Sequence, residues 1–115
     1  PKLFKDESDV AFGPLLVRKY FEFNGDSIRR IEEKSKNWAS DRIAKLDVLV
    51  MKLCIAEWRG FEEIPVKVSL NEYLDLAKEY STPKSSSFIN GVLDKIVANL
   101  REEGLMNKVG RGMIE

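Results

Sequence analysis

The sequence predicts an all-α protein, a helical bundle of about five helices, and three observations lead to this class. Apolar residues recur at spacings of three and four along every long segment, which is the period of a helix with one buried face. No segment shows the sustained alternation of apolar and polar residues that a half-buried strand requires. Glycine, proline and short polar residues stand between the periodic segments, where helices begin and end.

The first predicted helix spans residues 9–23, where Pro14 is tolerated because it falls in the first turn. Its apolar residues lie three or four positions apart: Phe12, Leu15, Leu16, Tyr20 and Phe23. The pair Asn24 and Gly25 ends this helix. A second helix, at residues 26–37, has Asp26 as its N-cap and few apolar residues, so we expect it to be peripheral.

The third predicted helix, at residues 41–59 after a Ser40 cap, is apolar on most sides. A helix of this kind is buried, and we expect it at the centre of the molecule. Lys45, Lys52 and Arg59 share one narrow strip of this helix, and we interpret the strip as a solvated face.

Two acids, Asp47 and Glu57, interrupt the apolar arc of the third helix. A carboxylate there needs a partner or an opening to solvent, because burying an unpaired charge is costly. For Glu57 we expect a structural role, either an ion pair with Lys67 or a hydrogen bond near Asn71.

Residues 60–65 form the longest predicted loop, and the segment from Ser69 to Glu72 indicates a capping box that starts a fourth helix, ending near Tyr80. Its inward stripe consists of Leu70, Tyr73, Leu74 and Ala77. After Ser81, Thr82 and Pro83, a fifth helix carries the stripe Ile89, Leu93, Ile96 and Leu100. Gly104 stops this helix, and residues 105–115 are expected to form a flexible tail.

Composition indicates a folded domain: 115 residues with 43% hydrophobic content can bury one core, so we expect a single domain over residues 1–115. Lys and Arg number 19, as do Asp and Glu, so attraction to nucleic acid has to come from a local patch. Neither a membrane span nor a signal peptide is recognisable, and we expect a cytoplasmic location. Because the chain begins with Pro1 rather than Met, we expect it to be a piece of a longer protein.

Cys54 is the single cysteine, and the chain contains no histidine. An internal disulfide and a Cys/His zinc site are therefore both excluded. The lack of histidine also removes the Ser-His-Asp and Cys-His arrangements that commonly catalyse acyl transfer. We expect a protein that is not an enzyme and has no metal or other cofactor.

The fifth helix carries a second feature, a strip that favours a single-stranded nucleic acid. Phe88 lies about 100° from the centre of the apolar stripe, and Lys84, Gly91, Lys95 and Asn99 share its side of the helix. A flat ring beside cations gives a base a stacking surface and neutralises phosphate. The alternative is that Phe88 covers the edge of the core against a neighbouring helix.

Two segments resemble the paired C-terminal signature of the NusB family. Residues 64–78 read IPVKVSLNEYLDLAK and residues 88–95 read FINGVLDK, in the family's order and spacing. Upstream, Trp38 and the stretch at 53–57 resemble the family's central helix. The likeness covers most of the chain and is strongest after Asp41, whereas the family's arginine-rich N-terminal helix has no counterpart in this sequence.

The resemblance implies a transcription antitermination or termination factor. Such a factor binds the box A element of ribosomal RNA leader transcripts together with NusE, a ribosomal small-subunit protein, and works with the transcription elongation complex. It implies RNA contacts at Lys84, Ser87, Phe88 and Asp47, to which the strip adds Lys95. The carboxylate of Asp47 would accept hydrogen bonds from base amino groups at a surface opening; the alternative is a salt bridge to a nearby lysine or arginine.

Two other functions stay open at this point. NusB-like domains also occur at the N-terminus of ribosomal RNA cytosine methyltransferases, and a methyltransferase sequence after Glu115 would identify that case. A pure protein-interaction bundle would lack the steep salt dependence that phosphate contacts produce. We also expect exposed apolar surface on the first or third helix, which self-association would cover.

Overall fold

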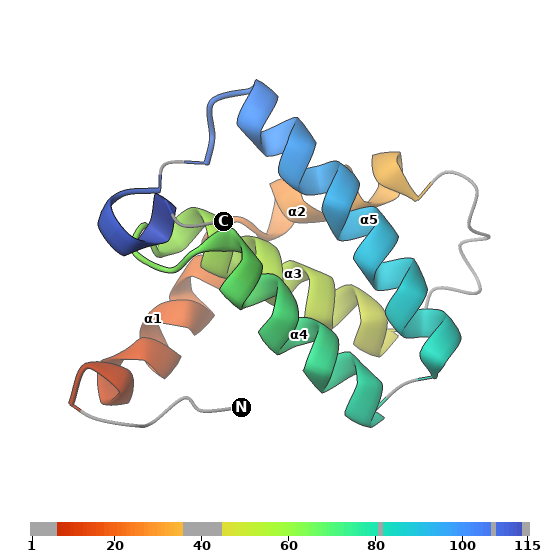
Figure 1. Cartoon of the computed structure of the whole chain (residues 1–115), viewed down its shortest axis with the longest axis horizontal. Coiled ribbons are helices and arrows are strands. Elements are labelled where there is room, and N and C mark those ends of the chain that lie inside the picture. The colour runs from red at the N-terminus through yellow and green to blue at the C-terminus, as the bar shows by residue number, and fades with distance from the viewer. Residues whose placement is uncertain (1–6, 36–44, 81, 107, 114–115) are drawn as a thin grey trace.

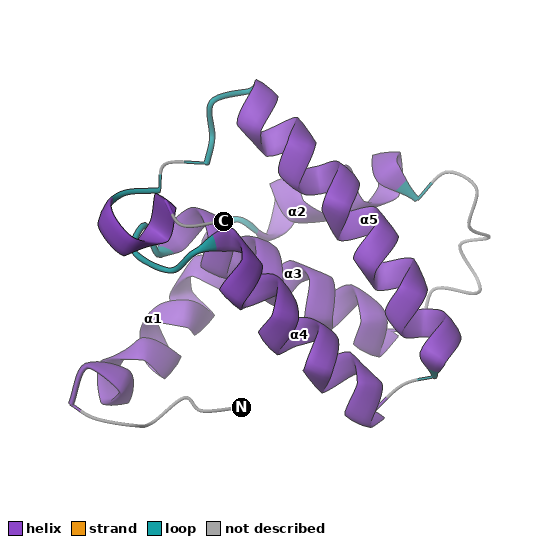
Figure 2. Cartoon of the chain, in the orientation of Figure 1, coloured by secondary structure: helices purple, strands orange, loops and turns teal. Residues whose placement is uncertain are grey.

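The computed structural model describes residues 7–35, 45–80, 82–106 and 108–113, and this part of the chain is all-α, as predicted. The elements are α1 (Glu7–Glu22), α2 (Asn24–Lys34), α3 (Lys45–Gly60), α4 (Val66–Tyr80), α5 (Pro83–Glu102) and the short 3-10 helix η2 (Gly110–Met113). Loops join the helices, and no strand occurs among these residues (Figure 2).

Helix α3 lies at the centre of the bundle, which confirms the prediction from its composition. It packs against all four other α-helices (Figure 1). Met51, Cys54 and Ile55 on α3 have no exposed surface. The predicted Ser40 cap and the first predicted turn, residues 41–44, lie outside the described residues.

The inward stripes of α4 and α5 meet this central helix as the periodicity predicts. Tyr73 and Ala77 of α4 are buried, and Leu70 and Leu74 pack against the core while half-buried. All four residues of the α5 stripe are fully buried: Ile89, Leu93, Ile96 and Leu100. Helix α5 ends where predicted, because Gly104 adopts a φ of 70°.

Helix α2 differs from the prediction in its start and in its burial. It begins at Asn24, and its N-cap is Phe23, which forms no side-chain cap hydrogen bond, so Asp26 is not the cap. The Ser27 amide donates to the Phe23 carbonyl at 2.8 Å, which shows that the chain turns within one residue after α1. Helix α2 is also not peripheral, since Ser27, Arg30 and Ile31 are buried.

The predicted capping box at the start of the fourth helix is wrong. Helix α4 begins three residues earlier, at Val66, directly after Pro65. The Pro65 carbonyl accepts hydrogen bonds from the amides of Val68 at 3.1 Å and Ser69 at 3.3 Å. Ser69 therefore lies inside the helix, where its hydroxyl is available to a buried partner on α3 rather than to the helix start.

The C-terminal segment differs from the expected flexible tail, because its described part packs on the loop between α3 and α4. The Val109 amide donates to the Glu62 carbonyl at 3.0 Å. The Lys108 ammonium donates to the Phe61 carbonyl at 2.8 Å. In Figure 1, η2 accordingly lies beside the start of α4.

Apolar side chains are exposed on α1 and α3, in agreement with the expectation from the sequence. Phe21 of α1 is 70% exposed, and Val17 of α1 and Leu49 of α3 are also exposed. Self-association through this surface stays a prediction. Among the described residues, no helix is both long and apolar enough to cross a membrane.

We predict that Gly112→Ala will loosen the C-terminal segment. Gly112 is buried, and a Cβ atom there would overlap the backbone carbonyl of Glu62. Since backbone cannot move aside cheaply, we expect the Val109 amide to exchange hydrogen about tenfold faster or more in the variant. Gly25→Ala is the control, because a Cβ at Gly25 meets nothing within 4 Å. Equal Val109 exchange in Gly112→Ala and the wild type would contradict the packing described.

Candidate nucleic-acid interface

The candidate interface lies on the first four turns of α5. Thr82 caps this helix, and its hydroxyl oxygen accepts a hydrogen bond from the Ser85 amide at 3.1 Å. Pro83 occupies the first helical position, where its missing N–H costs nothing. The next turns present the predicted residues, which we call the α5 surface: Lys84, Ser87, Phe88, Gly91 and Lys95.

Exposure on the α5 surface matches a stacking site flanked by cations. Lys84, Ser87 and Lys95 are exposed, whereas Phe88 is half-buried and packs partly against the core. Both sequence interpretations of Phe88 are therefore compatible, because one part of the ring covers the core edge while the rest is accessible. Gly91 is exposed, and nothing lies within 4 Å of the position a Cβ would take, so a ligand has room beside the ring.

The predicted strip ends at Lys95, because Asn99 has a structural role. Its side-chain oxygen accepts a hydrogen bond from the Arg30 guanidinium. Its amide nitrogen donates to Glu103 Oε2 at 2.9 Å. With both polar atoms of the amide engaged, Asn99 is not available to read a base.

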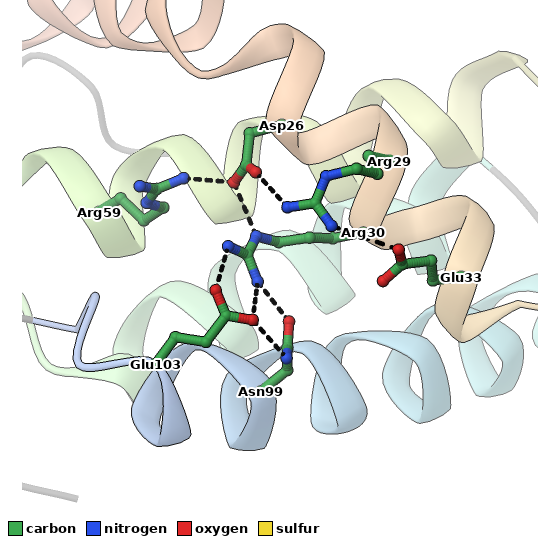
Figure 3. Close-up of polar contacts among 7 residues, drawn as sticks. All are labelled: Asp26, Arg29, Arg30, Glu33, Arg59, Asn99 and Glu103. Carbon is green, nitrogen blue, oxygen red and sulfur yellow. Dashed lines mark hydrogen bonds and ion pairs between the residues drawn. The ribbon is translucent and has the colours of Figure 1, made fainter.

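Arg30 is the centre of a polar cluster that sequence reasoning missed (Figure 3). We call the group the Arg30 cluster, and it comprises Asp26, Arg29, Arg30, Glu33, Arg59, Asn99 and Glu103. Arg30 is only 2% exposed, and its Nε donates to Asp26 Oδ2 at 2.7 Å. Its two terminal nitrogens donate to the two oxygens of Glu103 at 3.2 and 2.9 Å. Arg59 Nη1 reaches the same Asp26 oxygen at 2.6 Å, so the cluster joins α2, α3 and α5.

The arginines of the cluster favour the ionised forms of Asp26 and Glu103. Burial raises the pKa of Asp26, but the hydrogen bonds from Arg30 and Arg29 outweigh it and leave the pKa below its usual value. The hydrogen bond from Arg30 likewise lowers the pKa of Glu103. The local signals in the sequence were the helical spacings of three or four residues within α2, as between Asp26 and Arg30, and between Asn99 and Glu103 on α5. The partners on α3 and α5 become visible only in the folded chain.

The basic strip predicted as a solvated face of α3 is partly wrong. Lys45 is exposed, but Lys52 Nζ donates to Asn24 Oδ1 at 2.9 Å and lies 5.0 Å from the Tyr20 ring centroid. Arg59 pairs with Asp26 and lies 4.3 Å from the centroid of the Phe23 ring. Two of the three cations therefore face the junction of α1 and α2, because those helices cover that side of α3.

Asp47 does not share the α5 surface. Its side chain is buried, with 1% exposure, so the expected surface opening at this position is wrong. A buried carboxylate cannot meet the amino group of a base without a local rearrangement. We therefore leave Asp47 out of the candidate interface.

Glu57 has the structural role expected of it, with different partners. Its carboxylate accepts hydrogen bonds from the hydroxyl of Ser69 and from that of Tyr73, the latter at 3.2 Å, while Lys67 is exposed. Burial raises the pKa of Glu57, and the two hydrogen bonds only partly offset it. Burial also raises the pKa of Cys54 well above its usual value, so its thiol stays protonated.

Comparison with known proteins identifies one family. Residues 5–98 match the NusB family model. A relative from Salinibacter ruber, named transcription antitermination protein NusB, is 39% identical over 112 residues, which are 97% of this chain and 70% of the relative. Two relatives with the same name come from Chloroherpeton thalassium and Natranaerobius thermophilus. They are 40% and 44% identical over 74% and 63% of this chain.

The chain spans only part of these relatives, namely 40% of the length of the Chloroherpeton protein and 52% of that of the Natranaerobius protein. No solved structure matched the chain. Among the described residues, no group of three or more His, Cys, Asp or Glu side chains is placed to hold a metal ion.

We predict that Arg30→Ala will destabilise the fold by about 3 kcal/mol, because it removes the buried guanidinium that joins Asp26 of α2 to Glu103 of α5. Urea unfolding followed by circular dichroism measures the change in free energy. Arg29→Ala is the control, since its side chain is 52% exposed and its ion pairs with Asp26 and Glu33 are screened by water. Equal effects of the two substitutions would contradict the special role of Arg30.

We predict that the raised pKa of Glu57 makes the wild type lose stability as pH rises. The folded state binds the Glu57 proton more tightly than the unfolded chain, whose pKa is 4.5. The stabilising contribution is therefore complete below that value and is lost as pH rises through the raised folded-state pKa. Glu57→Gln removes this dependence, so its free energy of unfolding should rise relative to the wild type as pH increases above 4.5 and through the raised folded-state pKa. A constant difference across that range would show that Glu57 does not titrate in this way.

Proposed function

This chain belongs to the NusB family, and from this premise we propose that it is a transcription antitermination factor whose α5 surface binds single-stranded RNA. The observation that carries the proposal is the half-buried Phe88 ring between the exposed cations Lys84 and Lys95 on one helix. The family match supports the role in transcription, and the geometry of α5 supports the choice of RNA.

The α5 surface recognises RNA by stacking and by charge, without a catalytic step. A base stacks on the open part of the Phe88 ring, and such a contact contributes about 1 to 3 kcal/mol. Lys84 and Lys95 neutralise phosphates on either side of the ring, and binding releases the counterions held there. The exposed Ser87 hydroxyl donates a hydrogen bond to a phosphate or sugar oxygen.

Lys84 and Lys95 keep their charge available to such a ligand. The described ion pairs engage Lys19, Arg29, Arg30 and Arg59, and neither of these two α5 lysines takes part in one. Their positive potential is therefore not cancelled locally, although the whole chain has no net charge.

We propose box A RNA of ribosomal RNA leader transcripts as the ligand and NusE as the protein partner within the elongation complex. The family resemblance supports both. Two cations and one ring are a small set of contacts, so RNA binding by this chain alone should be weak and strongly salt-dependent. A partner that binds beside the RNA would supply the missing affinity.

We predict that Phe88→Ala will weaken binding of a short fluorescent box A RNA by about 1 to 3 kcal/mol, the loss expected for one stacking contact. Fluorescence anisotropy with and without NusE measures the affinity, and circular dichroism checks that helicity is retained. Phe21→Ala is the matched control, because this phenylalanine is 70% exposed on α1 and should leave the affinity unchanged. The proposal fails if the wild type does not bind the RNA even with NusE present, or if Phe88→Ala binds the RNA with the same affinity as the wild type.

A further inference from the structure

The C-terminal segment returns from the end of α5 to the loop between α3 and α4 (Figure 1). Gly104 adopts a φ of 70°, and the amide of Leu105 then donates to a carbonyl in the last turn of α5 at 2.9 Å. This turn places Leu105 and Met106 against the apolar core. Farther along, the Val109 amide donates to the Glu62 carbonyl at 3.0 Å. The described part of the segment is therefore held at both of its ends.

Lys108 brings a positive charge into this contact. Its side chain is half-buried, and its ammonium donates to the Phe61 carbonyl at 2.8 Å, just after the C-terminal end of α3. The last carbonyls of a helix carry a negative partial charge, which favours a cation at this place. Burial lowers the pKa of Lys108, and the charge of Glu57 opposes that change. Lys108 and Glu57 therefore attract each other when Glu57 is ionised.

The carboxylate of Glu57 is covered by α4. The hydroxyls of Ser69 and Tyr73 donate to its two oxygens, the latter at 3.2 Å. Both donors belong to α4, so the carboxylate keeps this cover when only the C-terminal segment moves away. Such an opening removes the Lys108 cation from a carboxylate that stays buried. This loss is costly for the ionised form of Glu57 and of little consequence for the protonated form.

The other titratable groups around Glu57 do not supply a second cation. They are Cys54 of α3, Tyr73 and Glu72 of α4, and Lys19 of α1. Burial raises the pKa of Cys54 and that of Tyr73, so both are neutral, and the charge of Glu72 opposes ionisation of Glu57. The stem of Lys19 lies against Gly60, but its ammonium pairs with Glu22 at 3.5 Å. Where α2 and α5 meet α3, the described ion pairs are those of the Arg30 cluster.

We infer that Glu57 and Lys108 form a pH-sensitive clasp, in which ionisation of Glu57 tightens the C-terminal segment on the loop between α3 and α4. The opened state keeps Glu57 covered and lacks the cation, so its Glu57 pKa lies above that of the closed state. The opened state thus binds the proton more tightly, and low pH favours opening. The added stabilisation of the closed segment is absent below the closed-state pKa and complete above the opened-state pKa.

This local response has the opposite sign to that of the whole fold. In the unfolded chain Glu57 returns to water, where its pKa is 4.5, so rising pH weakens the fold as a whole. In the opened state the carboxylate does not return to water, so rising pH strengthens the contact of the segment. The two signs distinguish opening of the segment from complete unfolding.

The test measures the protection of the Val109 amide against hydrogen exchange in the full chain, from pH 4.5 upward. Protection is the observed exchange rate compared with that of an unfolded amide at the same pH, so base catalysis of exchange cancels. We expect protection in the wild type to increase about three- to tenfold as Glu57 ionises. Glu57→Gln and Lys108→Met should both lack this increase. Lys67→Met is the matched control and should retain it, because Lys67 is exposed on α4.

A second measurement covers the case in which Lys108→Met loses protection at every pH. The pKa of Glu57, followed by nuclear magnetic resonance of its side-chain carboxyl carbon, should be higher in Lys108→Met than in the wild type and unchanged in Lys67→Met. A higher Glu57 pKa together with the loss of the pH-dependent protection supports the clasp. The inference is overturned if Lys108→Met leaves the Glu57 pKa unchanged, if Glu57→Gln keeps the increase in protection, or if protection in the wild type falls as pH rises.

Discussion

The buried guanidinium of Arg30 is the interaction on which the packing of α2 against α5 depends. A charge with 2% exposure is tolerable only when its donors are satisfied, and here its partners come from its own helix and from α5. Ile31 and the α5 stripe belong to the same apolar core, but apolar packing does not distinguish one register from another as strictly. The directional bonds of Arg30 distinguish one register from another, and so they determine which part of α2 lies beside Asn99 and Glu103 of α5.

This arrangement divides the basic side chains of the chain into two groups. Arg30 pairs with Asp26 and Glu103, and Arg59 pairs with Asp26. Lys52 donates a hydrogen bond to Asn24 and lies over the Tyr20 ring. These cations therefore stabilise the packing of α1, α2 and α5 on α3. Lys84 and Lys95 remain available at the surface of α5. A chain with equal numbers of acidic and basic residues can thus present a local positive site, because Asp26, Glu33 and Glu103 are held in ion pairs by arginines.

Much of the fold was predictable because helical periodicity reports burial directly. The central position of α3, the buried stripe from Ile89 to Leu100 and the stop at Gly104 all follow from local spacing. The errors concern polar residues with two possible partners. Asp26 and Ser69 have the side chains of good helix caps, yet each bonds a residue from a distant part of the chain, Arg59 and Glu57 respectively. The sequence correctly placed the predicted RNA-contacting residues of α5 on one helix, namely Lys84, Ser87, Phe88 and Lys95. The burial of Asp47 and the structural role of Asn99 depend on tertiary contacts, which helical periodicity cannot predict.

RNA binding at the α5 surface is tested most directly by titrating the isotope-labelled chain with box A RNA and following the amide signals by nuclear magnetic resonance. The largest shift changes are expected between Lys84 and Lys95, and they should weaken as salt is added. The outer face of α4, including Lys67 and Lys78, should show little change. Shift changes centred on α4, or none at α5 at any salt concentration, would contradict the account.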